Sequence, residues 1–328
     1  MAMTHITSQD NRQRRVIFVL EPFESPSGGV AVIYRHVEIL SNYNIKAYVA
    51  LPNKPKRDFY GSTAPLIIHG NQFQFEVGDI WVIPEGFAQY LQALRPARIR
   101  QLMFCQNQYC LPYGNDPRAG FLEEFGVHGV IASSESIRSF FRDVYGMADV
   151  PIIPYAIDTE IYKPAPSKRR QVAFMPRKLP RDARLICKIF QRRHPRHADI
   201  PWVAIEGTTQ REAARAMGES EIFLSLSHQE SFGLPPLEAM ACGCLVAGYH
   251  GDGGREYMNT ANGWWAETGD WKTCVDGIAA AIDLLNTGGA ALQARQEAMS
   301  ETLARYNPSR MESILLEFWK TELAKPTP

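Results

Sequence analysis

Short apolar runs alternate with amphipathic stretches along the chain, and this alternation limits its fold more than any other feature. The first run covers residues 14–20, and a stretch with helical spacing follows at about 29–40. Parallel strands need crossover connections, and the returning helix covers the sheet, so such alternation predicts an α/β fold. Further strands are expected within the runs IKAYVAL, DIWVIP, RQLMFCQ and HGVIASS.

The alternation is interrupted at a proline-rich segment, VPIIPYAIDTEIYKPAPSKRR. Proline ends helices and removes a backbone donor from a sheet, so we expect a hinge here. The pattern then restarts through QVAFMP, PWVAIEG, IFLSLS and CLVAGYH. A chain of 328 residues is also long enough for two cores. Two Rossmann-like domains are therefore predicted, residues 1–155 and 156–305.

The last segment, 306–328, is predicted to form a separate helix. Its apolar residues recur at roughly helical spacing; they are Met311, Ile314, Leu315, Phe318 and Leu323. We expect this helix to pack on a domain surface, and crossing back to the N-terminal domain is one option.

Charge and composition exclude several classes of protein. Lys and Arg number 35, as do Asp and Glu, so the formal net charge is zero and a nucleic-acid partner is not expected. The arginine groups Arg95, Arg98, Arg100 and Arg192, Arg193, Arg196 are interpreted as solvated helix ends. A polar start and the lack of a long apolar run predict a cytoplasmic protein without a transmembrane segment. Peripheral membrane contact through FAQYLQALRPARIR is an alternative that the zero net charge disfavours.

The six cysteines show no paired CxxC spacing of the kind that closes a zinc site. Buried, reduced thiols are expected instead. The chain also lacks a DxD pair of the sort that holds a divalent ion beside phosphates, so neither a metal nor another cofactor is predicted.

The most informative stretch joins a predicted strand ending at Ser227 to a helix that starts just after Gly233. Ligands of open α/β sheets bind at the carboxyl ends of strands, where a helix N-terminus offers free N–H groups to an anion. Glu230 lies before the turn and Glu238 inside the helix, with seven residues between them. A carboxylate can accept bonds from two neighbouring sugar hydroxyls. A binding site for a sugar phosphate is therefore predicted, although Glu238 could instead face solvent.

The string ESFGLPPLEAMACG resembles the signature of retaining GT-B glycosyltransferases of group 1 (family 4-like), with two glutamates spaced by seven residues. The likeness continues through GDGGREYM, NGWWAETGD and the preceding IEGTTQREAARAMGESEIFLSLS. It implies two Rossmann-like domains facing a central cleft, and transfer of a sugar from a UDP- or GDP-sugar without a metal. By the same resemblance Glu230 contacts the donor sugar, Glu238 the ribose, and Ser231, Phe232, Gly233 and Leu234 the sugar or diphosphate.

Basic residues follow the strand QVAFMP in the run RKLPRDAR. The resemblance implies an arginine at this strand end and a lysine some residues later, both on the diphosphate. Arg177 matches, but Lys178 is adjacent to it and the later position is not filled. We therefore assign the diphosphate to Arg177, then Lys178, with Arg181 as a rival, and the alternative is a set of solvated charges at a helix start.

The N-terminal half resembles the family more loosely. Gly28 and Gly29 stand where the family has a glycine-rich loop near the reaction centre. Glu85, Gln106 and Asn107 end two predicted strands and are candidates for the acceptor side. Many family members carry a histidine in this region, and here Gln106 and Asn107 are found instead. The acceptor could be a carbohydrate, a lipid-linked molecule or a small molecule.

Two other functions stay open at this point. A sugar-nucleotide epimerase can share the two-domain shape, although the paired glutamates favour transfer. A non-catalytic partner that binds a nucleotide sugar would suit the absent histidine and the altered basic motif.

Overall fold

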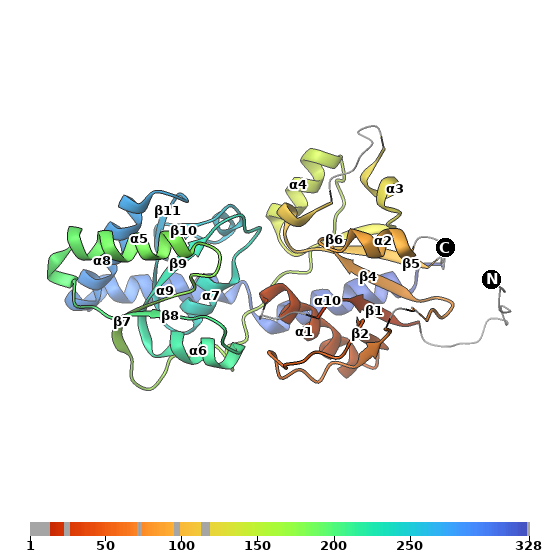
Figure 1. Ribbon diagram of the computed structural model, residues 1–328, viewed down its shortest axis with the longest axis horizontal. Helices are drawn as coiled ribbons and strands as arrows, with labels where there is room; N and C mark the ends of the chain where they lie inside the picture. The colour runs from red at the N-terminus through yellow and green to blue at the C-terminus, as the bar shows by residue number, and fades with distance from the viewer. Residues whose placement is uncertain are drawn as a thin grey trace.

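The computed structural model describes residues 14–22, 27–70, 72, 74–94, 99–112 and 119–326, which form two parallel sheets covered by helices (Figure 1). The N-terminal sheet has the order β3-β2-β1-β4-β5-β6 and the C-terminal sheet the order β11-β10-β9-β7-β8. Every paired neighbour runs parallel. The predicted α/β class, with two Rossmann-like domains, is confirmed.

The N-terminal sheet contains each strand expected from the apolar runs and one more at its edge. Its strands are β1 (Val16–Val19), β2 (Ala47–Leu51), β3 (Leu66–Ile68), β4 (Ile80–Pro84), β5 (Arg100–Cys105) and β6 (Gly129–Ala132). The unexpected edge strand β3 has three residues, too few to show a period. The accompanying helices are α1 (Gly28–Asn42), α2 (Ala88–Leu94), the short η2 (Gln108–Cys110), α3 (Phe121–Phe125) and α4 (Glu135–Tyr145).

The C-terminal sheet follows the predicted order of strands and helices and adds one unpredicted edge strand at residues 264–266. Its strands are β7 (Arg169–Phe174), β8 (Trp202–Ala204), β9 (Ser220–Ser227), β10 (Leu245–His250) and β11 (Trp264–Ala266). The helices are α5 (Pro180–Arg193), η3 (Pro195–His197), α6 (Gln210–Gly218), α7 (Leu234–Ala241), η4 (Gly253–Glu256), α8 (Trp271–Thr287) and α9 (Gly289–Ala304).

The last helix, α10 (Pro308–Leu323), lies against the N-terminal sheet beside α1 (Figure 1). Met311, Leu315 and Trp319 are buried in one cluster with residues of the first sheet. The rings of Trp319 and Phe18 of β1 meet edge to face, with centroids 6.0 Å apart. The helix crosses back to the N-terminal domain, an option that the sequence left open, and completes a core there. Trp319 was absent from the predicted apolar set, although it extends the row of residues spaced by four.

Two stretches of chain connect the sheets, and they run together. The first includes the proline-rich segment, and the second joins α9 to α10. The N–H of Ile157 donates to the carbonyl of Tyr306 over 2.9 Å, which ties the two crossings to each other. Beside them Phe232 contacts the rings of Tyr155, Tyr257 and Tyr306.

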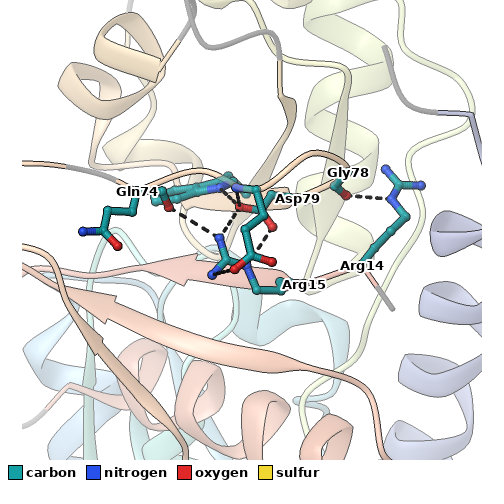
Figure 2. A network of polar contacts seen from close by, with 7 residues as sticks. Arg14, Arg15, Gln74, Gly78 and Asp79 are labelled. Carbon is teal, nitrogen blue, oxygen red and sulfur yellow. Dashed lines mark hydrogen bonds and ion pairs between the residues drawn. The ribbon is translucent and has the colours of Figure 1, made fainter. Parts of the chain in front are cut away.

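An ion-pair network fastens the start of β1 to the turn before β4 (Figure 2). Arg15 donates to both carboxylate oxygens of buried Asp79, at 2.9 and 2.6 Å. Arg14 donates from Nε to the carbonyl of Gly78 over 2.7 Å. Such a two-pronged pair fixes geometry as well as adding energy, so β1 and β4 are held in register at the end of the sheet away from their carboxyl termini.

Several surface expectations need correction. Arg100 is not a solvated helix end, since it starts β5 and pairs with buried Glu322 of α10. Arg193 and Arg196 are exposed but pair with carboxylates of α8, and Arg95 and Arg98 lie outside the described residues. The cysteines are free, as expected, but Cys110 is exposed and Cys187 half-buried.

The described residues contain neither a metal-binding cluster nor a helix suited to span a membrane. Among them, no group of three or more His, Cys, Asp or Glu side chains is placed to hold a metal ion. No helix in the described ranges combines the length and apolar character needed to cross a membrane.

Candidate active site

A cavity of about 1000 Å³ separates the two sheets and is lined by both domains. Its walls come from segments that follow the carboxyl ends of β1, β4 and β5 on one side, and of β7, β8 and β9 on the other. This is the edge at which open α/β sheets bind ligands. The lining includes Gly28, Gly29, Glu85, Gln106, Asn107, Arg177, Lys178, Glu230, Phe232, Gly233, Leu234 and Glu238. Two candidates, Ser231 and Arg181, are not among the lining residues that the structure describes.

Helix α7 points its N-terminus into the cavity. Gly233 caps it with a positive φ of 83°, which favours glycine, and Pro235 and Pro236 occupy the first turn, where an N–H is least needed. The buried hydroxyl of Tyr257 donates to the carbonyl of Gly233 and holds this turn in place. The first turn of α7 lines the cavity, so its remaining N–H groups and the positive end of the helix dipole are available to an anion there.

Helix α1 meets α7 across the cavity. A Cβ added at Gly28 would lie 3.2 Å from a side-chain carbon of Leu234, and one at Gly29 would lie 3.2 Å from the amide of Gln106. Both contacts are tight, so glycine at these positions allows the two helix starts and the end of β5 to approach one another. The residues before Ser27 in this loop, 23–26, lie outside the described residues.

The basic residues at the end of β7 divide into two groups. Arg177 and Lys178 line the cavity, and Lys178 Nζ lies 2.5 Å from a carboxylate oxygen of Glu230. Arg181 is exposed in the first turn of α5. This ion pair joins Lys178, which the sequence analysis assigned to the diphosphate, to Glu230, which it assigned to the donor sugar.

Glu238 faces the cavity from the first turns of α7 rather than bulk solvent. Burial raises its pKa to about 7, and a hydrogen bond from Tyr162 of the hinge segment acts in the opposite direction. A carboxyl group of this kind becomes a strong acceptor when it ionises. Tyr162 was not predicted as a site residue, and no short motif in the sequence marks it.

Ser231 joins the domains instead of lining the cavity. Its hydroxyl donates to Oδ1 of Asn107 over 3.0 Å and accepts from the N–H of Gln108 over 2.9 Å. The amide of Asn107 also donates to the carbonyl of Gln229 over 3.2 Å. Part of the predicted donor-binding loop is thus bonded to the end of β5, so the position of the loop depends on closure of the domains.

A second interdomain contact lies nearby, where Glu256 of η4 caps helix α4. Its Oε2 accepts from the N–H of Glu135 over 2.9 Å and from that of Ser136 over 3.3 Å. Burial raises the pKa of Glu256 above its ordinary value. The residue stands in the stretch GDGGREYM, but nothing in the sequence indicated that it would reach the other domain.

Comparisons with known proteins agree with this geometry. Residues 205–295 match the family described as Glycosyl transferases group 1. Over 267 residues the chain is 28% identical to an alpha-1,6-glucosyltransferase of Actinobacillus pleuropneumoniae serotype 7 (strain AP76), covering 78% of this chain and 80% of that protein.

Solved structures show the same fold over nearly the whole chain. Sucrose-phosphate synthase of Thermosynechococcus elongatus superposes with a TM-score of 0.72 at 11% identity, covering 95% of this chain and 100% of that one. HepE of Anabaena, in complex with UDP and glucose, gives 0.72 at 16% identity, covering 94% and 100%. These likenesses concern the fold alone. The activity is supported by the family match of residues 205–295, which run from just after β8 into α9. The chain therefore has the GT-B fold and is a glycosyltransferase that uses a nucleotide-sugar donor, and its residues 205–295 match the group 1 family.

Proposed function

We propose that the chain is a retaining, metal-independent hexosyltransferase that moves glucose from UDP-glucose to a hydroxyl group of an acceptor. The observation that carries this proposal is the convergence of two helix N-termini, two cations and two carboxylates on one interdomain cavity. The choice of glucose and UDP is supported by the named activity of the Actinobacillus relative and by the ligands of HepE. GDP is the second choice of nucleotide.

The diphosphate is assigned to the N-termini of α1 and α7, with Arg177 and Lys178 beside them. Backbone N–H groups and fixed cations stabilise the negative charge that grows on the leaving diphosphate. Because the protein itself supplies this positive charge, the scheme requires no divalent ion. Closure of the domains around the cavity would exclude water and protect the donor from hydrolysis.

The two glutamates are assigned to different parts of the donor. Glu238, next to Tyr162, accepts from the ribose hydroxyls, and Glu230 accepts from hydroxyls of the transferred sugar. Without a donor, Lys178 and Glu230 neutralise each other at 2.5 Å. A bound diphosphate would draw Lys178 toward its oxygens and release the Glu230 carboxylate for the sugar.

A thermal-shift panel tests the donor site. In EDTA, one nucleoside diphosphate should stabilise the protein, by about 2.7 kcal/mol at 100 times its dissociation constant. Stabilisation by none of them, or only with a divalent ion, would contradict the assignment of the diphosphate.

Product analysis then tests the reaction. Slow hydrolysis of the donor together with glycosylation of added acceptors marks a transferase. Interconversion of donors would mark an epimerase, and binding without turnover would mark a non-catalytic partner.

Glu238→Gln should weaken nucleotide binding, whereas Glu230→Gln should leave it nearly unchanged and lower turnover. The reverse result would exchange the two assignments.

A further inference from the structure

A buried carboxyl group at the end of β4 has no place in the scheme above. Glu85 is 7% exposed and lines the cavity on the side of the N-terminal domain. Its Oε2 atom is shielded from solvent and has no hydrogen-bond partner among the residues that the structure describes. A buried acceptor left unpaired costs ~1–3 kcal/mol, so such an atom in a ligand cavity indicates a donor group that arrives with the ligand.

A second unpaired acceptor stands beside it. Gln106, at the end of neighbouring β5, donates from Nε2 to the carbonyl of Gly29 over 3.0 Å, which directs its Oε1 elsewhere. That Oε1 atom is also buried, and no described residue hydrogen-bonds to it. The backbone of Gln106 is held by Tyr155, whose hydroxyl donates to its carbonyl over 3.3 Å and accepts from Ser133 over 2.9 Å. The pair of acceptors is thus rigidly placed before any ligand enters.

The surroundings leave room for a ligand at this point. A Cβ built on Gly86, next to Glu85, would meet no atom within 4 Å. Glu85 of the N-terminal domain and Glu230 of the C-terminal domain both line this cavity, as does Tyr155. Burial raises the pKa of Glu85 to about 7, so a substantial part of the population carries a carboxylate near neutral pH.

We propose that Glu85 Oε2 and Gln106 Oε1 form a subsite that accepts hydrogen bonds from two hydroxyl groups of a sugar ring. The inference rests on the proposed function. It assigns a sugar-binding role to the wall of the cavity opposite Glu230. The ring can belong to the transferred sugar of the donor or to a sugar acceptor. Both present the same vicinal hydroxyls, and the experiment separates them.

The test compares Glu85→Gln with the matched control Glu21→Gln. Glu21 is also in the N-terminal domain, but it bonds to Tyr90 and does not line the cavity. Calorimetry with UDP and with UDP-glucose gives the affinity contributed by the sugar. Saturation-transfer NMR with free glucose, recorded with UDP present, reports an acceptor-like sugar.

Glu85→Gln should leave the affinity for UDP unchanged. If the ring is that of the donor, the extra affinity of UDP-glucose over UDP should fall about tenfold to a hundredfold, the range expected for a hydrogen bond to a charged group. If the ring is that of the acceptor, UDP-glucose should bind as before and the glucose signal should disappear. Glu21→Gln should change neither measurement.

Other results would overturn the subsite. Unchanged sugar binding in both measurements, or an equal loss of UDP and UDP-glucose affinity, would show that Glu85 does not bind a sugar hydroxyl. Should the natural protein bind no UDP at all, the proposed function would fail instead, which the panel of nucleotides detects separately. Melting curves identify a folding defect. In that case Gln106→Met, which removes the acceptor Oε1 from the neighbouring residue, repeats the comparison with the same outcomes expected.

Discussion

Removing the charge of Glu256 should loosen the contact between the domains without abolishing it. In Glu256→Gln an amide oxygen can still accept from the N–H groups of Glu135 and Ser136, so the shape of the contact survives. A hydrogen bond to a charged acceptor is worth ~1.5–3 kcal/mol and a neutral one ~0.5–1.5 kcal/mol. The carboxylate also interacts with the N-terminal end of the α4 dipole, for ~0.3–1 kcal/mol.

The expected loss is about 1–2 kcal/mol, because Glu256 is only partly buried and water compensates for some of it. That range raises the open population by about fivefold to thirtyfold. Hydrogen exchange followed by mass spectrometry should show the amides at residues 135 and 136 exchanging faster by this factor, while β9 and β10 keep their protection.

Glu297→Gln is a suitable control, since it removes a carboxylate from exposed α9 far along the chain from the contact. Unchanged exchange at residues 135 and 136 in Glu256→Gln would refute the view that this carboxylate holds the domains together. Faster exchange throughout both sheets would indicate a general loss of stability instead.

Three further outcomes are expected. Arg177→Ala should weaken nucleoside diphosphate binding about tenfold to a hundredfold in calorimetry while leaving nucleoside binding almost unchanged, and an equal loss for both would place the phosphates elsewhere. UDP affinity of the natural protein should fall by up to tenfold per pH unit below about pH 7. Burial raises the pKa of Glu238 to about 7, and only its ionised form accepts from both ribose hydroxyls. A Glu238→Gln variant with the same pH profile would exclude this residue as the cause. Asp79→Asn should cost up to ~3 kcal/mol of stability in urea denaturation, because it leaves Arg15, whose side chain is only 16% exposed, without its two-pronged partner. A change in UDP affinity of similar size would contradict the separation of this network from the site.

Much of the fold could be predicted because the apolar runs are long and the crossover helices regular. The expected strands were found, and Gly233 and its prolines mark the start of α7 as their backbone chemistry requires. The edge strand β3 was missed because three residues carry no period. The burial of Trp319 was missed because spacing along a helix does not reveal which distant surface the helix meets.

Candidate site residues that belong to one segment could be predicted from the sequence. Contacts between residues of different domains were harder to predict. Glu230, Glu238 and Gly233 belong to one strand–turn–helix unit, so their spacing alone brought them to one cavity edge. The bonds of Ser231 to Asn107 and of Glu256 to α4 depend on how the domains close, which local pattern does not encode. Arg181 is close in sequence to Arg177, but it stands in the first turn of α5 and is not among the described residues that line the cavity.

The position of α10 has a consequence for how the chain is made. The N-terminal sheet ends at Ala132, yet its core is closed by residues of a helix that begins at Pro308. During translation the first domain therefore leaves the ribosome with an open apolar groove, and it stays incomplete until the whole second domain has been synthesised. A truncation or fusion placed within α10 would damage the first domain rather than the second. A fragment ending before this helix should accordingly expose the groove to chaperones and to aggregation, although it contains each strand of that sheet.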